Sequence, residues 1–400
     1  MPCKKKFVLL ALMLAINIAL LAATEKDSNV ITLKLQYKIP AVSEKQNVYI
    51  LPKDKVKYTD KGDILVLSRK YCTIYRFDSQ WQYTGSFLRA GEGPQEITYP
   101  QIITTLSNNR LLILNDDKFI FYEMKKDQLP EIARIKVPYS NIGDIEEYNQ
   151  EKLFVLTAYP LAPGLKGSDA GKFIHIYDLK NKKNTLDFFE APGETNRRDS
   201  SELRSEYGGG TIHYFENLLF LVYNQPGAMY VFNPEGILVK KISTLLPFVK
   251  YNTADVKRVE QDGNISVRMN YANTCQMNLF LLIPQKGVTK KQGFETLSSM
   301  KENPVAEQSG LGRRPISKNK KVFLITRINH GKGDTPLYHF YLSLLDYKEG
   351  KFINHLRVET AGVDISKSEF KCANDQSLVF LDEDFLYSFS LDEEVIFGSL

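Results

Sequence analysis

The stretch "IITTLSNNRLLILNDDKFIFYEM", residues 102–124, shows the pattern that decides the fold of this 400-residue chain. Three apolar-rich runs are separated by short polar turns, of which the first is Ser107–Arg110. The middle run, Leu111–Leu114, is continuously apolar, as expected of a strand that is buried on both faces. The stretch therefore predicts three consecutive β-strands.

The same unit recurs along the chain in a diverged form. Six further stretches carry it: residues 56–80, 145–189, 211–242, 256–287, 315–356 and 370–397. Successive copies begin roughly 40 to 65 residues apart, the length of one four-stranded propeller blade. One such sheet cannot bury both of its faces alone, so the copies must stack around a common axis. An aromatic content of 12 % also favours β structure.

The sequence therefore predicts an all-β fold, a single β-propeller of six or seven four-stranded blades, and the number of turns favours seven. We expect the leading strand, Val30–Pro40, to join the last blade and close the ring. A pair of β-sandwiches would also give many short strands, whereas a solenoid β-helix requires shorter repeats. Both remain alternatives.

The N-terminal segment has the order of a secretory signal peptide. Lys4, Lys5 and Lys6 precede an apolar run from Phe7 to Ala23, and small residues lead into a polar stretch. The alternative is a retained membrane anchor. We expect residues 1–23 to be the signal, residues 24–400 to form the propeller without a membrane span, and the protein to be extracytoplasmic.

Charge and cysteine content limit the partners. The formal charge of +5 falls to +2 when the three signal lysines are removed, so no electrostatic footprint for nucleic acid remains. Removal of the signal, which contains Cys3, leaves Cys72, Cys275 and Cys372, an odd number of distant cysteines, which disfavours a disulfide framework or a zinc site. The five histidines lie at different positions of their repeats. We expect no metal, no cofactor and a monomer.

The candidate site lies in loops, because binding residues are concentrated in loops on a rigid scaffold. The long loops are Tyr159–Lys172, Ala191–Gly210 and Glu295–Pro315. Arginine forks suit carboxylate and phosphate groups, and several arginines facing one end of the ring would form an anion-binding mouth. The predicted ligand-binding residues are Arg89, Glu92, Glu96, Arg197, Arg204, Tyr207, Arg313 and Arg327.

The segment "RAGEGPQEITYP", Arg89 to Pro100, has three interpretations. A phosphate-binding loop is disfavoured because Pro94 lacks a backbone donor. Glu92 and Glu96 could form an acid/base pair, but nothing in the sequence raises the pKa of either carboxyl group. The segment is therefore predicted to be a connector between blades, and we assign no catalytic residue.

Residues 73–105 resemble a recurring segment of secreted six-bladed β-propeller proteins of Bacteroides-type bacteria, which are related to the NHL-repeat group. The residues that carry the resemblance are Phe77, Asp78, Gly85, Gly91, Gly93, Pro94, Glu96 and Pro100. Residues 228–242 give a second, weaker match. The resemblance implies a secreted or surface binding protein without an agreed catalytic set. It implies six blades, and often a lipid anchor, for which this chain lacks a cysteine after its apolar run.

Together these features favour a secreted or periplasmic propeller that is not an enzyme and that recognises a glycan, peptide or protein at one end of the ring. The alternative is a propeller hydrolase or lyase that acts on carbohydrate, with or without a metal.

Overall fold

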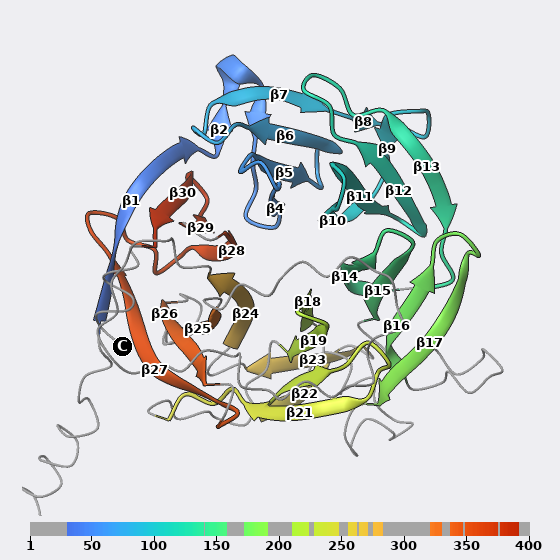
Figure 1. Ribbon diagram of the computed structural model, residues 1–400. Helices are drawn as coiled ribbons and strands as arrows, with labels where there is room; N and C mark the ends of the chain where they lie inside the picture. The colour runs from blue at the N-terminus through green and yellow to red at the C-terminus, as the bar shows by residue number, and fades with distance from the viewer. Residues whose placement is uncertain are drawn as a thin grey trace, which may run out of the picture.

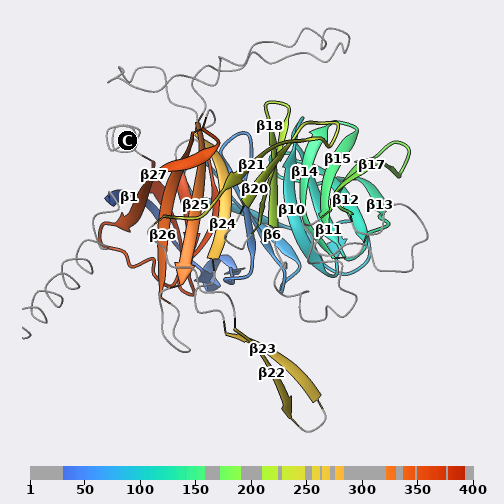
Figure 2. The same ribbon diagram turned by 90° about the horizontal axis from the view of Figure 1, so that it is seen from below.

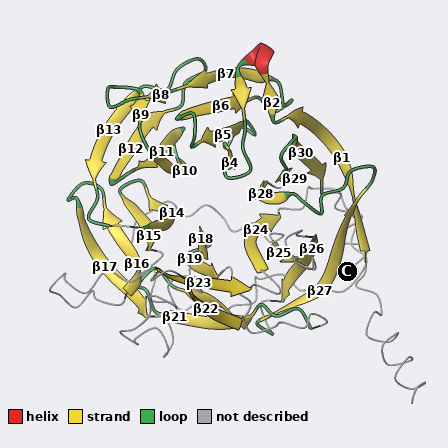
Figure 3. Ribbon diagram, turned by 180° about the vertical axis from the view of Figure 1, so that it is seen from behind, coloured by secondary structure: helices red, strands yellow, loops and turns green. Residues whose placement is uncertain are grey.

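The computed structural model describes residues 30–139, 141–157, 172–190, 210–223, 228–247, 255–261, 264–270, 275–282, 321–329, 337–346, 349–374 and 377–391. These residues are almost entirely β-strand, and their only helical element is a single 3₁₀ turn, Glu44–Gln46 (Figure 3). Within this part of the chain no helix is long and apolar enough to cross a membrane. The predicted all-β class is confirmed.

The first half of the chain forms three antiparallel four-stranded sheets, each in chain order. Their strands are β4 (Lys55–Tyr58), β5 (Ile64–Ser68), β6 (Thr73–Phe77) and β7 (Tyr83–Phe87); β10 (Pro100–Leu106), β11 (Arg110–Asn115), β12 (Lys118–Glu123) and β13 (Glu131–Lys136); and β14 (Ile142–Asn149), β15 (Lys152–Thr157), β16 (Lys172–Asp178) and β17 (Lys183–Glu190). Two short pairs flank the first of these sheets along the chain: β2 (Val42–Ser43) with β3 (Val48–Tyr49) precedes it, and β8 (Arg89–Ala90) with β9 (Glu96–Ile97) follows it.

The second half repeats the arrangement, and its sheets are joined at their outer strands. The strands are β18 (Gly210–Phe215), β19 (Leu218–Tyr223), β20 (Ala228–Phe232) and β21 (Leu238–Ser243); β24 (Cys275–Leu282), β25 (Lys321–Asn329), β26 (Tyr338–Asp346) and β27 (Lys351–Thr360); and β28 (Glu369–Ala373), β29 (Ser377–Leu381) and β30 (Phe385–Ser390), which are completed by β1 (Val30–Pro40).

The sheets stand side by side around one axis, with the first strand of each nearest the centre and the last at the outside (Figure 1). The inner strands β28, β4, β10, β14, β18 and β24 contact one another in that order. The middle strands are buried on both faces; Leu111, Leu112 and Ile113 are 0 % exposed. Continuous apolar runs suit these strands because a neighbouring sheet covers each face. The fold is that of a β-propeller.

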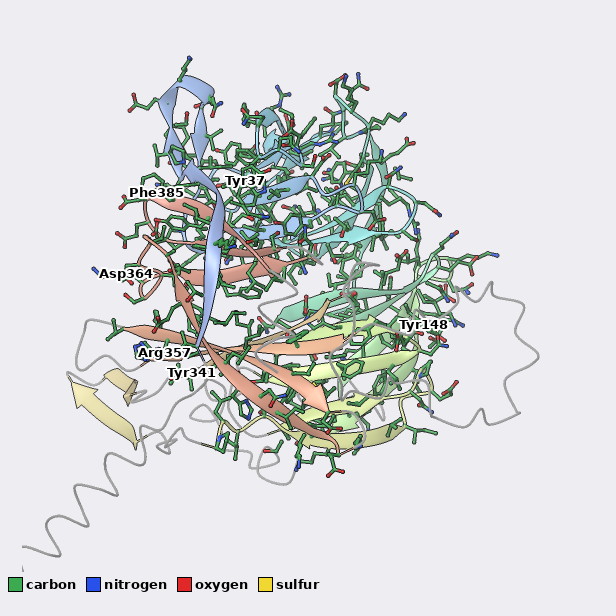
Figure 4. The ribbon with its side chains drawn as sticks, turned by 60° about the vertical axis from the view of Figure 1, so that its left-hand side comes forward. Tyr37, Tyr148, Tyr341, Arg357, Asp364 and Phe385 are labelled. Carbon is green, nitrogen blue, oxygen red and sulfur yellow. The ribbon has the colours of Figure 1, made fainter. Side chains whose placement is uncertain are left out.

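β1 connects the two ends of the chain. Its first residues pair parallel with β27, and the rest, from Lys34 to Pro40, pairs antiparallel with β30. In Figure 4, β1 runs between Arg357 at one end and Phe385 at the other. Ile31 and Leu33 are each 1 % exposed and pack into the core shared by the two C-terminal sheets. The predicted pairing of Val30–Pro40 with the last sheet is confirmed.

The fifth and sixth repeats differ from the prediction. β22 (Asp255–Gln261) and β23 (Asn264–Asn270) pair only with each other among the described strands, and Figure 2 shows this hairpin outside the ring. β24 instead pairs with β25, so these two repeats contribute one four-stranded sheet and a separate hairpin. The turn pattern cannot distinguish the two outcomes, because a hairpin has the same strand–turn–strand signature wherever it packs.

Candidate functional site

Four of the predicted ligand-binding residues lie in the described part of the chain: Arg89, Glu92, Glu96 and Arg327. Arg197, Arg204, Tyr207 and Arg313 lie outside it, as does most of each long loop. Arg89, Glu92 and Glu96 lie near β8 and β9, at the periphery of the ring between β7 and β13 (Figure 1). Arg327 lies on β25, where its guanidinium group is 4.1 Å from the ring centroid of Tyr338. The four residues do not form one cluster.

The segment from Arg89 to Pro100 connects the outer strand β7 to the inner strand β10. The Glu96 carboxylate holds the turn, because it accepts the Gly93 N–H at 2.8 Å and the Arg89 Nε–H at 2.8 Å. These two donors, the Gly93 N–H first, lower the pKa of Glu96. An ionised, hydrogen-bonded carboxylate is a poor general acid, so the geometry gives Glu96 a structural role. Its role in ligand binding remains a prediction.

A shallow hollow of about 320 Å³ lies beside this connector and is lined by Leu88, Arg89, Pro94 and Gln95. The Arg89 side chain is 80 % exposed, and Glu92 is also exposed. The outer surface of the connector is therefore accessible, but only Arg89 supplies a charged side chain to the hollow.

Gly91 is a sensitive position in this connector. Its φ is +148°, and a Cβ there would overlap the Glu96 carboxylate. We expect Gly91→Ala to lower the free energy of unfolding by about 2 kcal/mol, from backbone strain and from displacement of Glu96. Gly85→Ala is the matched control, because Gly85 has a φ of +155° but nothing within 4 Å of its Cβ position. Equal urea unfolding curves for the two variants would contradict the bracing role of Glu96.

Sequence reasoning missed a group of cations near the axis. Lys55 and Lys57 lie on β4, Lys371 lies on β28, and Arg69 lies in the turn after β5. We call Lys55, Lys57, Arg69, Lys371 and Arg327 the cationic mouth. Lys55 is exposed, yet desolvation, together with the charges of Lys371, Lys57 and Arg69, lowers its pKa, and Asp144 opposes this effect. Desolvation likewise lowers the pKa of Lys371; Glu369 and Asp54 oppose this effect, and the charge of Arg327 adds to it.

The cations differ in how they are held. Lys371 Nζ donates to the Pro52 carbonyl and lies 2.8 Å from Glu369 Oε2. The Arg69 backbone N–H donates to Asp54 at 3.1 Å. The ammonium groups of Lys55 and Lys57 form no hydrogen bond or ion pair with any other residue that the structure describes. The mouth therefore combines fixed cations with two lysines whose ammonium groups are available to a ligand.

Carboxylates on β14 brace the neighbouring inner strands. Asp144 accepts the Ile212 N–H of β18 at 2.9 Å, and Glu146 accepts a backbone hydrogen bond from Tyr214. Glu147 points the other way and accepts the Ser107 N–H at 2.6 Å. The alternation follows from the two-residue period of a strand. These carboxylates accept hydrogen bonds from backbone N–H groups of neighbouring inner segments that would otherwise lack a partner inside the ring.

Burial also changes the titration of two of these inner groups. Desolvation raises the pKa of Glu146 to about 8; the charge of Lys57 opposes the rise, and those of Asp144 and Glu147 add to it. Desolvation, with the charge of Lys57, lowers the pKa of His213 on β18 to about 3. Its Nε2 is buried and has no hydrogen-bond partner in the part of the chain that the structure describes. His213 is therefore neutral at physiological pH.

The described histidines do not converge on one site. His175 Nδ1 lies 2.6 Å from Asp187 Oδ1, and its Nε2 lies 3.3 Å from the Thr157 hydroxyl. This order resembles a nucleophile, base and orienting acid, but Thr157 is only 1 % exposed and His175 is 0 % exposed. The arrangement is therefore an internal hydrogen-bond network. Among the described residues, no group of three His, Cys, Asp or Glu side chains is placed to hold a metal ion.

One sequence signal could have located the mouth. On β4 charged residues alternate with apolar ones, as Lys55, Val56 and Lys57, and β14 shows the same alternation from Asp144 to Glu146. Each pair lies on the first strand of its repeat, which faces the axis in a propeller. The alternation alone would have indicated an ordinary edge strand, because charges at strand edges are common in antiparallel sheets.

No family model matches the sequence, and no curated protein matches it. Solved structures do match its fold. A member of the DUF4221 family from Bacteroides vulgatus is 10 % identical, with 92 % of this chain and 99 % of that chain covered and a TM-score of 0.53. A Bacteroides fragilis protein described as exported is 10 % identical, with 91 % and 100 % covered and a TM-score of 0.49.

Virginiamycin B lyase from Staphylococcus aureus is 12 % identical, with 90 % of this chain and 100 % of the lyase covered and a TM-score of 0.43. Identities this low show likeness of fold and not of activity. The match to the DUF4221-family structure therefore supports the fold alone, and the chain is an all-β propeller.

Proposed function

We propose that this protein is an exported, single closed propeller of six four-stranded blades that binds its ligand at one end of the ring. The blade number rests on the strand pairing, in which each of six inner strands begins a four-stranded group and β1 completes the last. Export rests on the N-terminal segment, residues 1–23, which has the order of a cleaved signal. The secreted or periplasmic location follows from export.

The cationic mouth is the observation that carries the binding function. In an antiparallel sheet, the start of the first strand, the turn after the second strand and the start of the third strand lie at the same end. Lys55 and Lys371 are near the starts of inner strands, Arg69 follows β5, and Arg327 is near the end of β25. Four segments that are distant in sequence thus place cations at one end of the ring, where ligands of propellers can reach the axis.

Binding is favoured over hydrolysis or lysis of carbohydrate because the candidate carboxylates are already engaged. Glu96 closes its own turn, and Asp144 and Glu146 accept main-chain N–H groups of β18. Glycoside hydrolysis needs two carboxyl groups that face a substrate at a defined separation. The ligand classes that suit the mouth are a glycan, a peptide or a protein surface.

The test is an array screen of the full chain, purified after export with its N-terminus determined by mass spectrometry. Glycan and peptide arrays are probed with the wild-type protein, with Lys55→Glu and with the control Lys241→Glu, which changes a lysine on the outer strand β21. We expect a ligand signal that Lys55→Glu abolishes and Lys241→Glu retains. A signal that is equal in all three proteins places binding elsewhere, and turnover of a polysaccharide by the pure chain favours the enzyme alternative.

A further inference from the structure

Two exposed tyrosines, Tyr71 and Tyr99, lie beside Arg69 of the cationic mouth. Tyr71 is 39 % exposed and Tyr99 is 56 % exposed, whereas large aromatic side chains are usually more buried. The Tyr49 and Tyr71 ring centroids are 5.2 Å apart. The Arg69 guanidinium group lies 5.7 Å from the Tyr99 ring centroid, and Lys70 Nζ lies 5.4 Å from that of Tyr71. We call these five residues the tyrosine platform.

The platform is built from three segments that the structure ties together. Cys72 Sγ donates to the Thr98 carbonyl at 3.3 Å, which joins the turn after β5 to the residues before β10. The Tyr99 N–H donates to Asn115 Oδ1 at 2.8 Å, which fixes its backbone. Tyr49 belongs to β3. The exposed rings therefore stand on a fixed backbone and not on a free loop.

Arg69 links the platform to the mouth. Its backbone N–H donates to Asp54, the residue before Lys55, and its guanidinium group lies over Tyr99. Lys55 itself is paired with Leu67, two residues before Arg69. Aromatic rings and cations are therefore adjacent at the same end of the first blade. Tyr99 has no ring contact with another aromatic side chain among the described residues, so its exposed face is available.

Exposed tyrosine rings beside cations suit a ligand in which one sugar unit carries both an apolar ring face and an anionic group. The exposed face of a tyrosine packs against the C–H face of a pyranose ring, and Arg and Lys bind carboxylate or sulfate groups. A neutral sugar would use only the rings, and a plain anion would use only the cations. Charge complementarity thus favours an acidic sugar.

We propose that the tyrosine platform and Lys55 of the cationic mouth form a binding site for acidic glycans, that is, for pyranose units that carry a carboxylate or a sulfate. This inference rests on the proposed binding function and names its ligand class. Tyr99 and Tyr71 stack on the sugar, while Arg69 and Lys55 bind the anionic group.

Titration calorimetry of the full chain tests the proposal with matched pairs of probes. Oligogalacturonate is compared with its methyl ester, and a sulfated galactan oligosaccharide with its desulfated form. We expect at least one acidic probe to bind roughly 10-fold or more tightly than its neutral partner, with an affinity that falls as salt rises. The pair that shows the difference identifies carboxylate or sulfate as the recognised group.

Variants locate the site. Tyr99→Ala and Arg69→Met are each expected to weaken binding of the acidic probe by roughly 10-fold. The controls Ile132→Ala, at an outer position that is 54 % exposed, and Lys241→Met are expected to leave it unchanged. Equal binding of acidic and neutral probes, or unchanged affinity in Tyr99→Ala and Arg69→Met, overturns the proposal.

The failure of this inference can be told apart from failure of the proposed function. If no acidic probe binds, but another ligand binds and is lost in Lys55→Glu, the ligand class is wrong and the binding function stands. If every ligand that the chain binds is unaffected by Lys55→Glu, the mouth is not the binding site and both fail.

Discussion

Replacing Leu33 by aspartate is expected to lower the free energy of unfolding by more than about 4 kcal/mol, which is enough to leave much of the protein unfolded. Leu33 is 1 % exposed and lies in the core formed by the two C-terminal sheets. Removing a buried leucine side chain costs about 2 to 5 kcal/mol, and burying a carboxylate without a partner adds to that cost. Leu33→Ala should give the smaller, measurable part of the effect.

Thr32→Asp is the matched control, because Thr32 is the residue before Leu33 on β1 and faces solvent. It should change the free energy of unfolding by no more than about 0.5 kcal/mol. Urea or thermal unfolding followed by far-UV circular dichroism measures all three variants. Wild-type stability of Leu33→Asp would show that β1 does not hold the two C-terminal sheets together.

Replacing Glu146 by glutamine is expected to flatten the pH dependence of stability. The folded-state pKa of Glu146 is raised to about 8 from its ordinary value of 4.5, so the folded protein holds this proton more tightly than the unfolded chain does. Its contribution is therefore fully present below about pH 4.5 and is lost as pH rises through about 8. The Glu146→Gln variant should keep that stability at high pH, because the amide stays neutral and still accepts the Tyr214 N–H.

At about pH 9 we expect the Glu146→Gln variant to be more stable than the wild type by on the order of 2 kcal/mol, once solvent screening of this partly exposed side chain is allowed for. At about pH 4 the two proteins should differ little. Glu349→Gln is the control, since that side chain is 63 % exposed. A wild-type profile that is flat between these two pH values, or parallel to that of the variant, would falsify the assignment of a raised pKa.

The sequence predicted the structure best where a residue pattern is compatible with only one kind of secondary structure and burial. The run Leu111–Leu114 is short and bounded by polar turns, which favours a strand covered on both faces, and the structure buries it. Asn108 and Asn109 indicate the turn before it, and both adopt positive φ, of 61° and 55°, which asparagine tolerates better than most residues. The pairing of Val30–Pro40 with β30 was also predictable, since a propeller needs a strand to close its ring.

The sequence predicted less where a pattern is compatible with two positions in the fold, inside a blade or outside the ring. The hairpin of β22 and β23 has the alternation of a blade strand pair, but its place outside the ring depends on contacts that local sequence does not encode. The site shows the same limit. Arg89 and Glu96 attracted attention because glycines surround them, whereas Lys55 and Lys371 become neighbours only when the first and last sheets adjoin.

The cationic mouth exists only if the two ends of the chain meet, because Lys55 lies on the first sheet and Lys371 on the last. Lys34 of β1 and Ser390 of β30 are directly paired, and the Cβ atoms of such residues lie about 4.5–5.5 Å apart, close to the reach of a disulfide. The measurement is disulfide formation in the double variant Lys34→Cys, Ser390→Cys under mild oxidation, by peptide mapping. A closed ring predicts a bond between positions 34 and 390 in most of the folded protein, with stability higher by about 2 to 4 kcal/mol than in the reduced form. Two thiols that both stay reactive toward a maleimide in the folded protein would contradict closure, and with it the site.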